Sequence, residues 1–262
     1  MSIDRSRRIT FEEVADLYDE VRPGYPDELV GDVLALSGIQ AGGRILEIGC
    51  GPGNATVQFA QHGYQILGIE LGERLAALAA KNCQAYPGVE IVNSSFEEWE
   101  LKEAAFDLAI SADAFHWIPP EVGYPKVSRA LKKTGSAAFF WNMPVDPRTE
   151  WSRAIEEVYQ KTSPGLENPD KPSFTAEQLT EIICENFINS ACFGPVTTRK
   201  YSGSVTLSSD QYLKLLRTFS SHRELDEATR KNLFAEIRKV LERYGGQVTK
   251  PQATILFIAR RT

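Results

Sequence analysis

The stretch Arg44-Ile45-Leu46-Glu47-Ile48-Gly49-Cys50-Gly51-Pro52-Gly53-Asn54-Ala55-Thr56 decides how the fold of this chain is interpreted. A short apolar run of β character ends in three alternating glycines, and a helical pattern begins directly afterwards. Glycine at such a turn permits positive φ angles and lets the backbone come close to a ligand. The first turn of the following helix also offers unpaired N–H groups. The stretch therefore predicts a ligand-binding turn between a strand and a helix.

Two classes of ligand are bound by glycine-rich turns of this kind. Dinucleotide-binding folds need Gly-x-Gly-x-x-Gly, which seats a pyrophosphate on the helix N-terminus. Gly49 and Gly51 satisfy the first two positions, but Asn54 stands at the third. Glu47 would oppose a pyrophosphate, whereas it suits a ligand that carries an ammonium and a sulfonium group. The pattern disfavours a NAD-dependent oxidoreductase, and a tight turn without any ligand is the other alternative.

Short apolar runs alternate with helical patterns around this turn. Strands are expected at 45–48, 65–71, 89–96, 106–111 and 136–141, and helices at 54–62, 73–85 and 120–131. Such alternation predicts a parallel sheet with helices on both faces. The second half reads as mainly helical, with helices at 150–161, 175–186, 208–221 and 226–244 and strands at 192–205 and 253–259. We expect residues 148–187 and 208–246 to cover the strand ends as a cap.

Composition and charge argue against several functions. The net charge is −6 and the pI about 5.3, which opposes binding to phosphate backbones, so nucleic acid is not expected as a partner. The N-terminus is charged, and no run of about 18 apolar residues occurs, so we expect no membrane association and a cytoplasmic location. The cysteines form no CxxC pair and have no histidine cluster nearby, so neither a metal site nor a disulfide framework is expected: Cys50, Cys83, Cys184 and Cys192.

The glycine motif resembles the nucleotide-loop signature of the class I S-adenosylmethionine (SAM)-dependent methyltransferases. The resemblance implies an α/β fold: a Rossmann-like, doubly wound, mostly parallel seven-stranded sheet with helices on both faces and a helical cap from the C-terminal half. It implies SAM as the cofactor and S-adenosyl-L-homocysteine as its product. The expected domains are an N-terminal helical lid at 1–35, a SAM-binding core at 36–147, and a region at 148–262 that holds the cap insertions and the last two strands.

The resemblance also implies which residues contact the cofactor. An acid at the end of the second strand bonds both ribose hydroxyls in the family, and Glu70 stands there, followed by Leu71. After the third strand the family usually has an acid and an apolar residue at the adenine; here Ser95 replaces the acid and Phe96 follows. Ala112, at the end of the fourth strand, completes the set. The loop residues implied at the methionine part are Glu47, Gly49, Cys50, Gly51, Gly53 and Asn54.

The end of the fourth predicted strand carries residues that suit the chemistry. Ligands of open α/β sheets bind beyond the carboxyl ends of the strands, where Asp113, Phe115, His116 and Trp117 fall. His116 is the candidate general base, because the unperturbed pKa of histidine is near 6.5. With a carboxylate acceptor no base is needed, and His116 would orient the acceptor instead. Simple packing is the alternative for these side chains.

An N-terminal polar and aromatic stretch is expected to fold over the site. It contains Tyr18, Arg22 and Tyr25, and Arg22 is a candidate partner for the SAM carboxylate or an anionic acceptor. Asn142, after the fifth predicted strand, is expected to line the same pocket. The N-terminal and Phe-His-Trp stretches resemble the trans-aconitate methyltransferase-like, type 11 group, whose understood members methylate small molecules.

The prediction is therefore a SAM-dependent methyltransferase that acts on a carboxylate or hydroxyl oxygen of a small molecule. Methyltransferases of nucleobase amino groups usually carry an Asn/Asp-Pro-Pro-aromatic run after the fourth strand, and this chain has Asp113-Ala114-Phe115-His116 there. A SAM-binding module without turnover and a methyltransferase that acts on protein are the alternatives. The sequence leaves the identity of the acceptor and the oligomeric state open.

Overall fold

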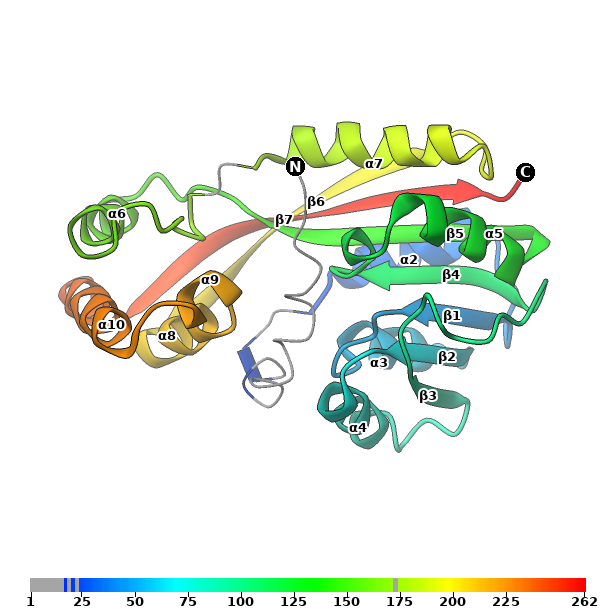
Figure 1. Ribbon diagram of the computed structural model, residues 1–262, viewed down its shortest axis with the longest axis horizontal. Coiled ribbons are helices and arrows are strands. Elements are labelled where there is room, and N and C mark those ends of the chain that lie inside the picture. The colour runs from blue at the N-terminus through cyan, green and yellow to red at the C-terminus, as the bar shows by residue number, and fades with distance from the viewer. Residues whose placement is uncertain (1–16, 18–19, 22–23, 172–173) are drawn as a thin grey trace.

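A computed structural model describes residues 17, 20–21, 24–171 and 174–262 of the chain (Figure 1). In this part, one seven-stranded sheet has the strand order β3-β2-β1-β4-β5-β7-β6. Neighbours from β3 to β5 are parallel, whereas β7 runs antiparallel to β5 and β6. The predicted Rossmann-like fold is thus confirmed. The strands are β1 (Arg44–Ile48), β2 (Gln65–Glu70), β3 (Val89–Asn93), β4 (Phe106–Ala112), β5 (Leu131–Pro144), β6 (Thr197–Ser208) and β7 (Gln247–Arg260).

Helices cover both faces of the sheet because successive strand residues point to opposite sides. On one face, Ile45 packs with α2 and α3; on the other, Leu46 packs with α5 and α7. Both residues are fully buried, as the continuously apolar strands predict. The helices are α2 (Asp27–Ser37), α3 (Asn54–Ala60), α4 (Glu73–Asn82), the 3₁₀ turn η2 (Phe115–Trp117), α5 (Pro120–Ala130), α6 (Glu150–Thr162), α7 (Ala176–Ser190), α8 (Ser209–Arg217), α9 (Ser220–Arg223) and α10 (Glu227–Arg243).

The cap is built on a ribbon of two strands that continues past the sheet. The pairing of β5 with β7 ends at Pro144 and Gln252, but β6 and β7 stay paired as far as Ser208 and Gln247. Helices α6, α8 and α10 pack around this ribbon in a hydrophobic core of their own. Figure 1 shows these helices and α9 at one end of the molecule, beyond the tips of β1 to β4. The second core explains how the cap stays ordered at a distance from the sheet.

One helix expected in the cap lies elsewhere. Residues 148–187 were expected to cover the strand ends, yet α7 packs on the face of the sheet beside α5. Leu179, Ile183 and Phe187 recur every four residues, so they form one apolar stripe, and all three join the core of the sheet. The ring of Phe187 meets Tyr124 of α5 edge to face, with 4.9 Å between the centroids. Within residues 148–187, α6 packs in the core of the cap.

The N-terminal region divides between the sheet and the cap. Helix α2 lies mostly within the stretch expected to be a lid, but it packs against β5 and β7. Val21 instead belongs to the apolar core of the cap, and Glu20 pairs with Lys214 of α8. The described residues of the first 25 positions therefore contact both the sheet core, through Tyr25, and the cap.

Candidate functional site

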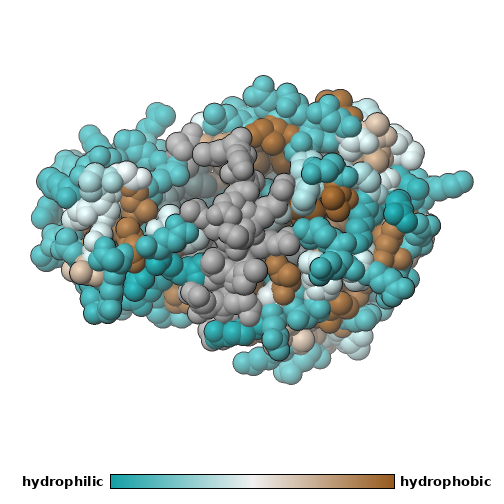
Figure 2. Space-filling model, viewed as in Figure 1, coloured by the Kyte–Doolittle hydropathy of each residue, from teal (hydrophilic) through white to brown (hydrophobic). Residues whose placement is uncertain are grey.

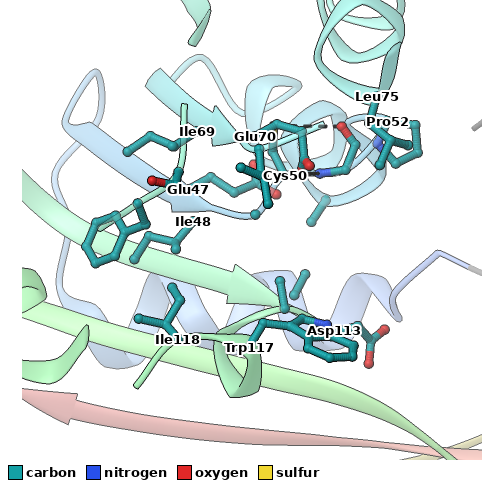
Figure 3. Close-up of a pocket in the computed structure, with 18 of the residues that line it drawn as sticks. Glu47, Ile48, Cys50, Pro52, Ile69, Glu70, Leu75, Asp113, Trp117 and Ile118 are labelled. Carbon is teal, nitrogen blue, oxygen red and sulfur yellow. Dashed lines mark hydrogen bonds between the residues drawn. The ribbon is translucent and has the colours of Figure 1, made fainter. Parts of the chain in front are cut away.

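A pocket opens at the carboxyl ends of β1, β2 and β4, where an open parallel sheet binds its ligands. Figure 3 shows Glu47, Cys50 and Glu70 on one side and Asp113 and Trp117 on the opposite side. Many of the residues implied by the family resemblance lie in its wall. They are Tyr25, Glu47, Gly49, Cys50, Gly51, Asn54, Glu70, Leu71, Ser95, Phe96, Ala112, Asp113 and Trp117.

The glycine turn brings its backbone against the loop after β4. Gly49 has a φ of 68°, and a Cβ on it would lie 2.5 Å from the Cβ of Ala114. Only glycine fits a position that combines this conformation with such a close approach. The N–H groups of Gly49 and Cys50 both bond the carbonyl of Ile69, at 2.8 and 3.2 Å. The turn is therefore anchored to β2. Gly53, the N-cap of α3, packs against Ala79 and Cys83 and does not line the pocket.

Glu70 connects the glycine turn to the start of α4. Its Oε2 accepts a 2.8 Å hydrogen bond from Gly51 N, and its Oε1 accepts a 2.9 Å bond from Gly72 N. The residue is 9% exposed. Two backbone N–H donors stabilise a carboxylate charge and fix its orientation. The acid expected at the ribose is thus held rigidly in the pocket wall.

Glu47 is a buried acid whose two oxygens have no hydrogen-bond partner among the described residues. Burial raises the pKa of this carboxyl to about 8; the nearby Thr56 hydroxyl lowers the pKa and the charge of Glu70 raises it. A buried polar group without a partner costs free energy. Since Glu47 also lines the pocket, the site suits a ligand with a positive or hydrogen-bond-donating group. The acid, the close-packed glycine and Glu70 together fit SAM.

The loop after β3, which is expected from the sequence to contact the adenine, lines the pocket. The Ser95 hydroxyl donates to Glu98 Oε2 at 3.1 Å and accepts from Glu98 N at 3.2 Å, so it closes a local turn. Phe96 is buried and stacks on Trp99. Lys126 of α5 clamps this loop: its Nζ donates to the carbonyls of Glu97 at 3.0 Å and Trp99 at 2.6 Å. It also lies 5.4 Å from the ring centroid of Phe96. The sequence prediction did not include Lys126.

Asp113 joins three distant segments at the opposite wall. Its Oδ2 accepts a 2.9 Å bond from the Tyr25 hydroxyl, and its Oδ1 accepts a 2.9 Å bond from Asn142 N. Tyr25 is also held by the side chain of Gln58, which bonds both its N–H and its carbonyl. Asn142 itself does not line the pocket; its side-chain oxygen accepts from Thr254 at 2.7 Å. Asp113 and Gln58 thus place Tyr25 at the pocket wall.

The Phe-His-Trp run points in three directions. Trp117 lines the pocket, while Phe115 is buried in the sheet core, with 3.9 Å between its ring centroid and that of Phe139. His116, between them in the chain, is partly exposed and does not line the pocket; its Nδ1 accepts a 3.0 Å hydrogen bond from the indole of Trp141. Burial lowers the pKa of His116 to about 4, so its ring is neutral at physiological pH.

Some predicted residues and classes of site remain outside this pocket. Tyr18 and Arg22 lie outside the described residues. Four residues that line the pocket were not predicted: Leu75, Ser94, Glu97 and Ile118. Each is either a neighbour of a predicted residue or an apolar residue at a helix start.

Across the described ranges, no three His, Cys, Asp or Glu side chains gather to hold a metal ion. In the same ranges, no helix is both long and apolar enough to cross a bilayer.

Comparison with known proteins identifies the family. A family model described as a methyltransferase domain matches residues 45–135, which include the glycine turn and Glu70. An uncharacterized methyltransferase of Geobacillus sp. is 30% identical over 187 residues, which cover 67% of this chain and 86% of the relative. An uncharacterized methyltransferase of Mycobacterium tuberculosis is 27% identical over 201 residues, 75% of this chain and 79% of the relative.

Solved structures share the fold. Phosphoethanolamine N-methyltransferase 2 of Haemonchus contortus, in complex with phosphomonomethylethanolamine and S-adenosylhomocysteine, superposes with a TM-score of 0.55 at 17% identity. The match covers 98% of this chain but only 59% of that enzyme, so the chain spans about three fifths of its length. The YcgJ protein of Bacillus subtilis matches with a TM-score of 0.55 at 13% identity, over 90% of this chain and 98% of that one.

The chain belongs to the class I SAM-dependent methyltransferases. The predicted enzyme class and cofactor are thereby confirmed. The narrower trans-aconitate methyltransferase-like group stays a prediction, as do the roles of the individual site residues and the cytoplasmic location.

Proposed function

We propose that this enzyme transfers the methyl group of SAM to an oxygen atom of a small molecule, either a carboxylate or a hydroxyl. The observation that carries the proposal is the shape of the site. The glycine turn and Glu70 form one wall of the pocket, and side chains of Tyr25, Asp113 and Trp117 form the other. An acceptor must reach the methyl group past these side chains, which favours a small molecule over a folded partner.

In this proposal the pocket residues divide the cofactor between them. SAM supplies a methyl group on a sulfonium, which is already a good leaving group, so the enzyme mainly needs to align the acceptor. The turn from Gly49 to Gly53, with Glu47, holds the methionine part. Glu70 holds the ribose, and the loop at Ser95 and Phe96 holds the adenine.

The surface supports a small acceptor. On the face drawn in Figure 2, hydrophilic residues predominate over the described part, and the hydrophobic ones form separate small patches. The exposed large apolar side chains of the described part come from several segments: Val122, Val145 and Tyr244 stand singly, and α7 carries two, Ile182 and Ile188. Isolated apolar residues of this kind are normal on a protein surface, whereas a docking face for a protein substrate usually exposes a contiguous patch.

Cofactor binding is the first test. Thermal unfolding with S-adenosylhomocysteine, with NAD as the control ligand, should show a shift with S-adenosylhomocysteine alone; at 100 times the dissociation constant the native state gains about 2.7 kcal/mol. Glu70→Ala should weaken binding by about 1.5–3 kcal/mol, the range for hydrogen bonds to a charged group. Glu73→Ala, an exposed acid three residues later, is the matched control and should bind normally. Equal affinity of a folded Glu70→Ala variant would contradict the ribose assignment.

The acceptor class is the second test. The enzyme is incubated with methyl-labelled SAM and separate pools of small carboxylic acids, small alcohols and unlabelled protein. Label that appears in the acid pool and is released as methanol by mild base identifies a methyl ester. Base-stable label in the alcohol pool identifies an ether. Label only in protein would overturn the small-molecule proposal, and binding without turnover on any pool would favour a SAM-binding module.

A further inference from the structure

The hydrogen bond between Trp141 and His116 determines where the histidine carries its proton. The indole Nε1 of Trp141 lies 3.0 Å from Nδ1 of His116. An indole N–H can only donate, so Nδ1 must offer its lone pair. The proton of the neutral ring therefore lies on Nε2. A ring in this state has no unprotonated nitrogen left for the acceptor: one lone pair faces the indole, and the other nitrogen already carries hydrogen.

The surrounding sheet holds Trp141 in place. It is 5% exposed and pairs with Ile255 across the β5–β7 ladder. Its ring meets Phe257 edge to face, with 5.8 Å between the centroids. An indole enclosed by strand neighbours cannot turn its N–H elsewhere without a cavity opening in the core. The donor is therefore a fixed feature of the fold, unlike a donor on a mobile loop.

The partners of His116 differ from those of a histidine base. In acid–histidine pairs, a carboxylate accepts from one ring nitrogen and stabilises the charged imidazolium that forms. Here the corresponding nitrogen accepts from a neutral donor, which stabilises the uncharged ring. In the described part of the chain, His116 has Trp141 as its hydrogen-bond partner and the rings of Trp117 and Trp141 as its aromatic neighbours. Burial, which lowers the pKa of His116, also favours the uncharged ring.

We propose that Trp141 is a positioning residue that keeps His116 as a neutral Nε2–H donor, so that His116 donates a hydrogen bond to the methyl acceptor and removes no proton from it. The inference rests on the proposed function, because His116 does not line the cofactor pocket and the acceptor has to extend past Trp117 to the partly exposed His116. It narrows the acceptor to an atom that is unprotonated before it binds, such as a carboxylate oxygen. That oxygen's lone pair forms the O–CH₃ bond, the pair of the broken C–S bond stays on sulfur, and no proton moves.

The tautomer can be measured without any acceptor. The chain has three histidines, so the nitrogen resonances of His116 can be assigned by comparison with His116→Gln. In the wild-type protein, ¹⁵N-detected imidazole spectra should show Nε2 protonated and Nδ1 as a hydrogen-bond acceptor from pH 5.5 to pH 8. Trp141→Phe keeps a large ring but removes the donor. In this variant His116 should populate both tautomers, because no donor then occupies Nδ1.

Trp151→Phe is the matched control, because Trp151 is also buried but packs in the cap against Tyr212. It should leave the His116 resonances unchanged. A second measurement needs no tryptophan variant: the indole N–H of Trp141 should exchange slowly with solvent and should shift in His116→Leu. A proton on Nδ1, a charged His116 at pH 7, or identical His116 spectra in wild type and Trp141→Phe would each overturn the inference. If the wild-type protein does not bind S-adenosylhomocysteine, the proposed function is refuted, but the tautomer of His116 is still established by the spectra.

Discussion

Replacing Glu47 by glutamine tests whether a buried acid at the cofactor pocket is neutral in the folded protein. Glutamine keeps the size of the side chain but stays uncharged at every pH. The carboxyl of Glu47 is fully buried without a hydrogen-bond partner among the described residues, and its pKa is raised from 4.5 to about 8. A raised native pKa means that the folded protein binds a proton which the unfolded chain has already lost. The free energy of unfolding is therefore highest below the usual pKa and falls as the pH rises towards 8.

The size of the effect follows from the pKa change. Each pKa unit corresponds to about 1.4 kcal/mol, so a rise from 4.5 to about 8 makes the native state about 5 kcal/mol less stable at high pH than at low pH. About 2.5 kcal/mol of this loss should fall between pH 6 and pH 9. The Glu47→Gln variant should lack this part of the pH dependence. Its absolute stability also contains the cost of a buried amide, so the change between the two pH values is the quantity to compare.

Urea unfolding followed by circular dichroism at both pH values measures the difference. Glu90→Gln is the matched control, because Glu90 is an exposed acid on β3, another strand of the same sheet. The control should lose as much stability as the wild type between the two pH values, whereas Glu47→Gln should lose about 2.5 kcal/mol less. If Glu47→Gln and the wild type show the same loss, Glu47 is ionised in the native state and the argument from burial is wrong.

Three further predictions concern other parts of the molecule. Lys250→Met removes the ion-pair partner of Asp170, a carboxylate that is 1% exposed in the cap, and should lower the free energy of unfolding in urea by about 3–5 kcal/mol. The control Lys231→Met, in an exposed ion pair, should change it by less than about 0.5 kcal/mol. Similar costs for the two variants would contradict the role of the buried pair. Lys126→Met frees the carbonyls of Glu97 and Trp99 and should weaken S-adenosylhomocysteine binding by about 1 kcal/mol in calorimetry, and unchanged affinity would exclude the clamp. His116→Gln retains an N–H donor and should keep at least about tenfold more turnover than His116→Leu on a carboxylic acid acceptor. Equal turnover of the two variants would contradict the donor role of His116.

Local pattern was sufficient for the cofactor side of the site. The strand, glycine turn and helix around Gly49 are consecutive in the chain, and Glu70 follows at the end of the next strand. Parallel strands bring their carboxyl ends to one edge of the sheet, so a correct strand pattern already places these residues together. The family model that confirms the class of enzyme matches residues 45–135, which include the same glycine turn and Glu70.

Pattern was insufficient where contacts depend on packing between distant segments. The apolar stripe of α7 predicted a buried face but not which surface buries it, so the helix was assigned to the cap. The hydrogen bond between Tyr25 and Asp113 joins residues that are 88 positions apart, and no local sequence pattern predicts it. The strand predicted at 192–205 begins at Thr197, after the break at Gly194 and Pro195, and continues to Ser208 because the ribbon with β7 extends into the cap.

The sequence by itself determined the fold class, the glycine turn and the identity of the acids around it, because these follow from the order of strands and helices. Only the tertiary structure decided the chemical state of the side chains. Burial in the sheet raises the pKa of Glu47 to about 8, and β5 places the indole of Trp141 against Nδ1 of His116, which directs the histidine proton to Nε2. Protonation depends on the partners and the burial that folding supplies, and neither can be derived from the residue type alone.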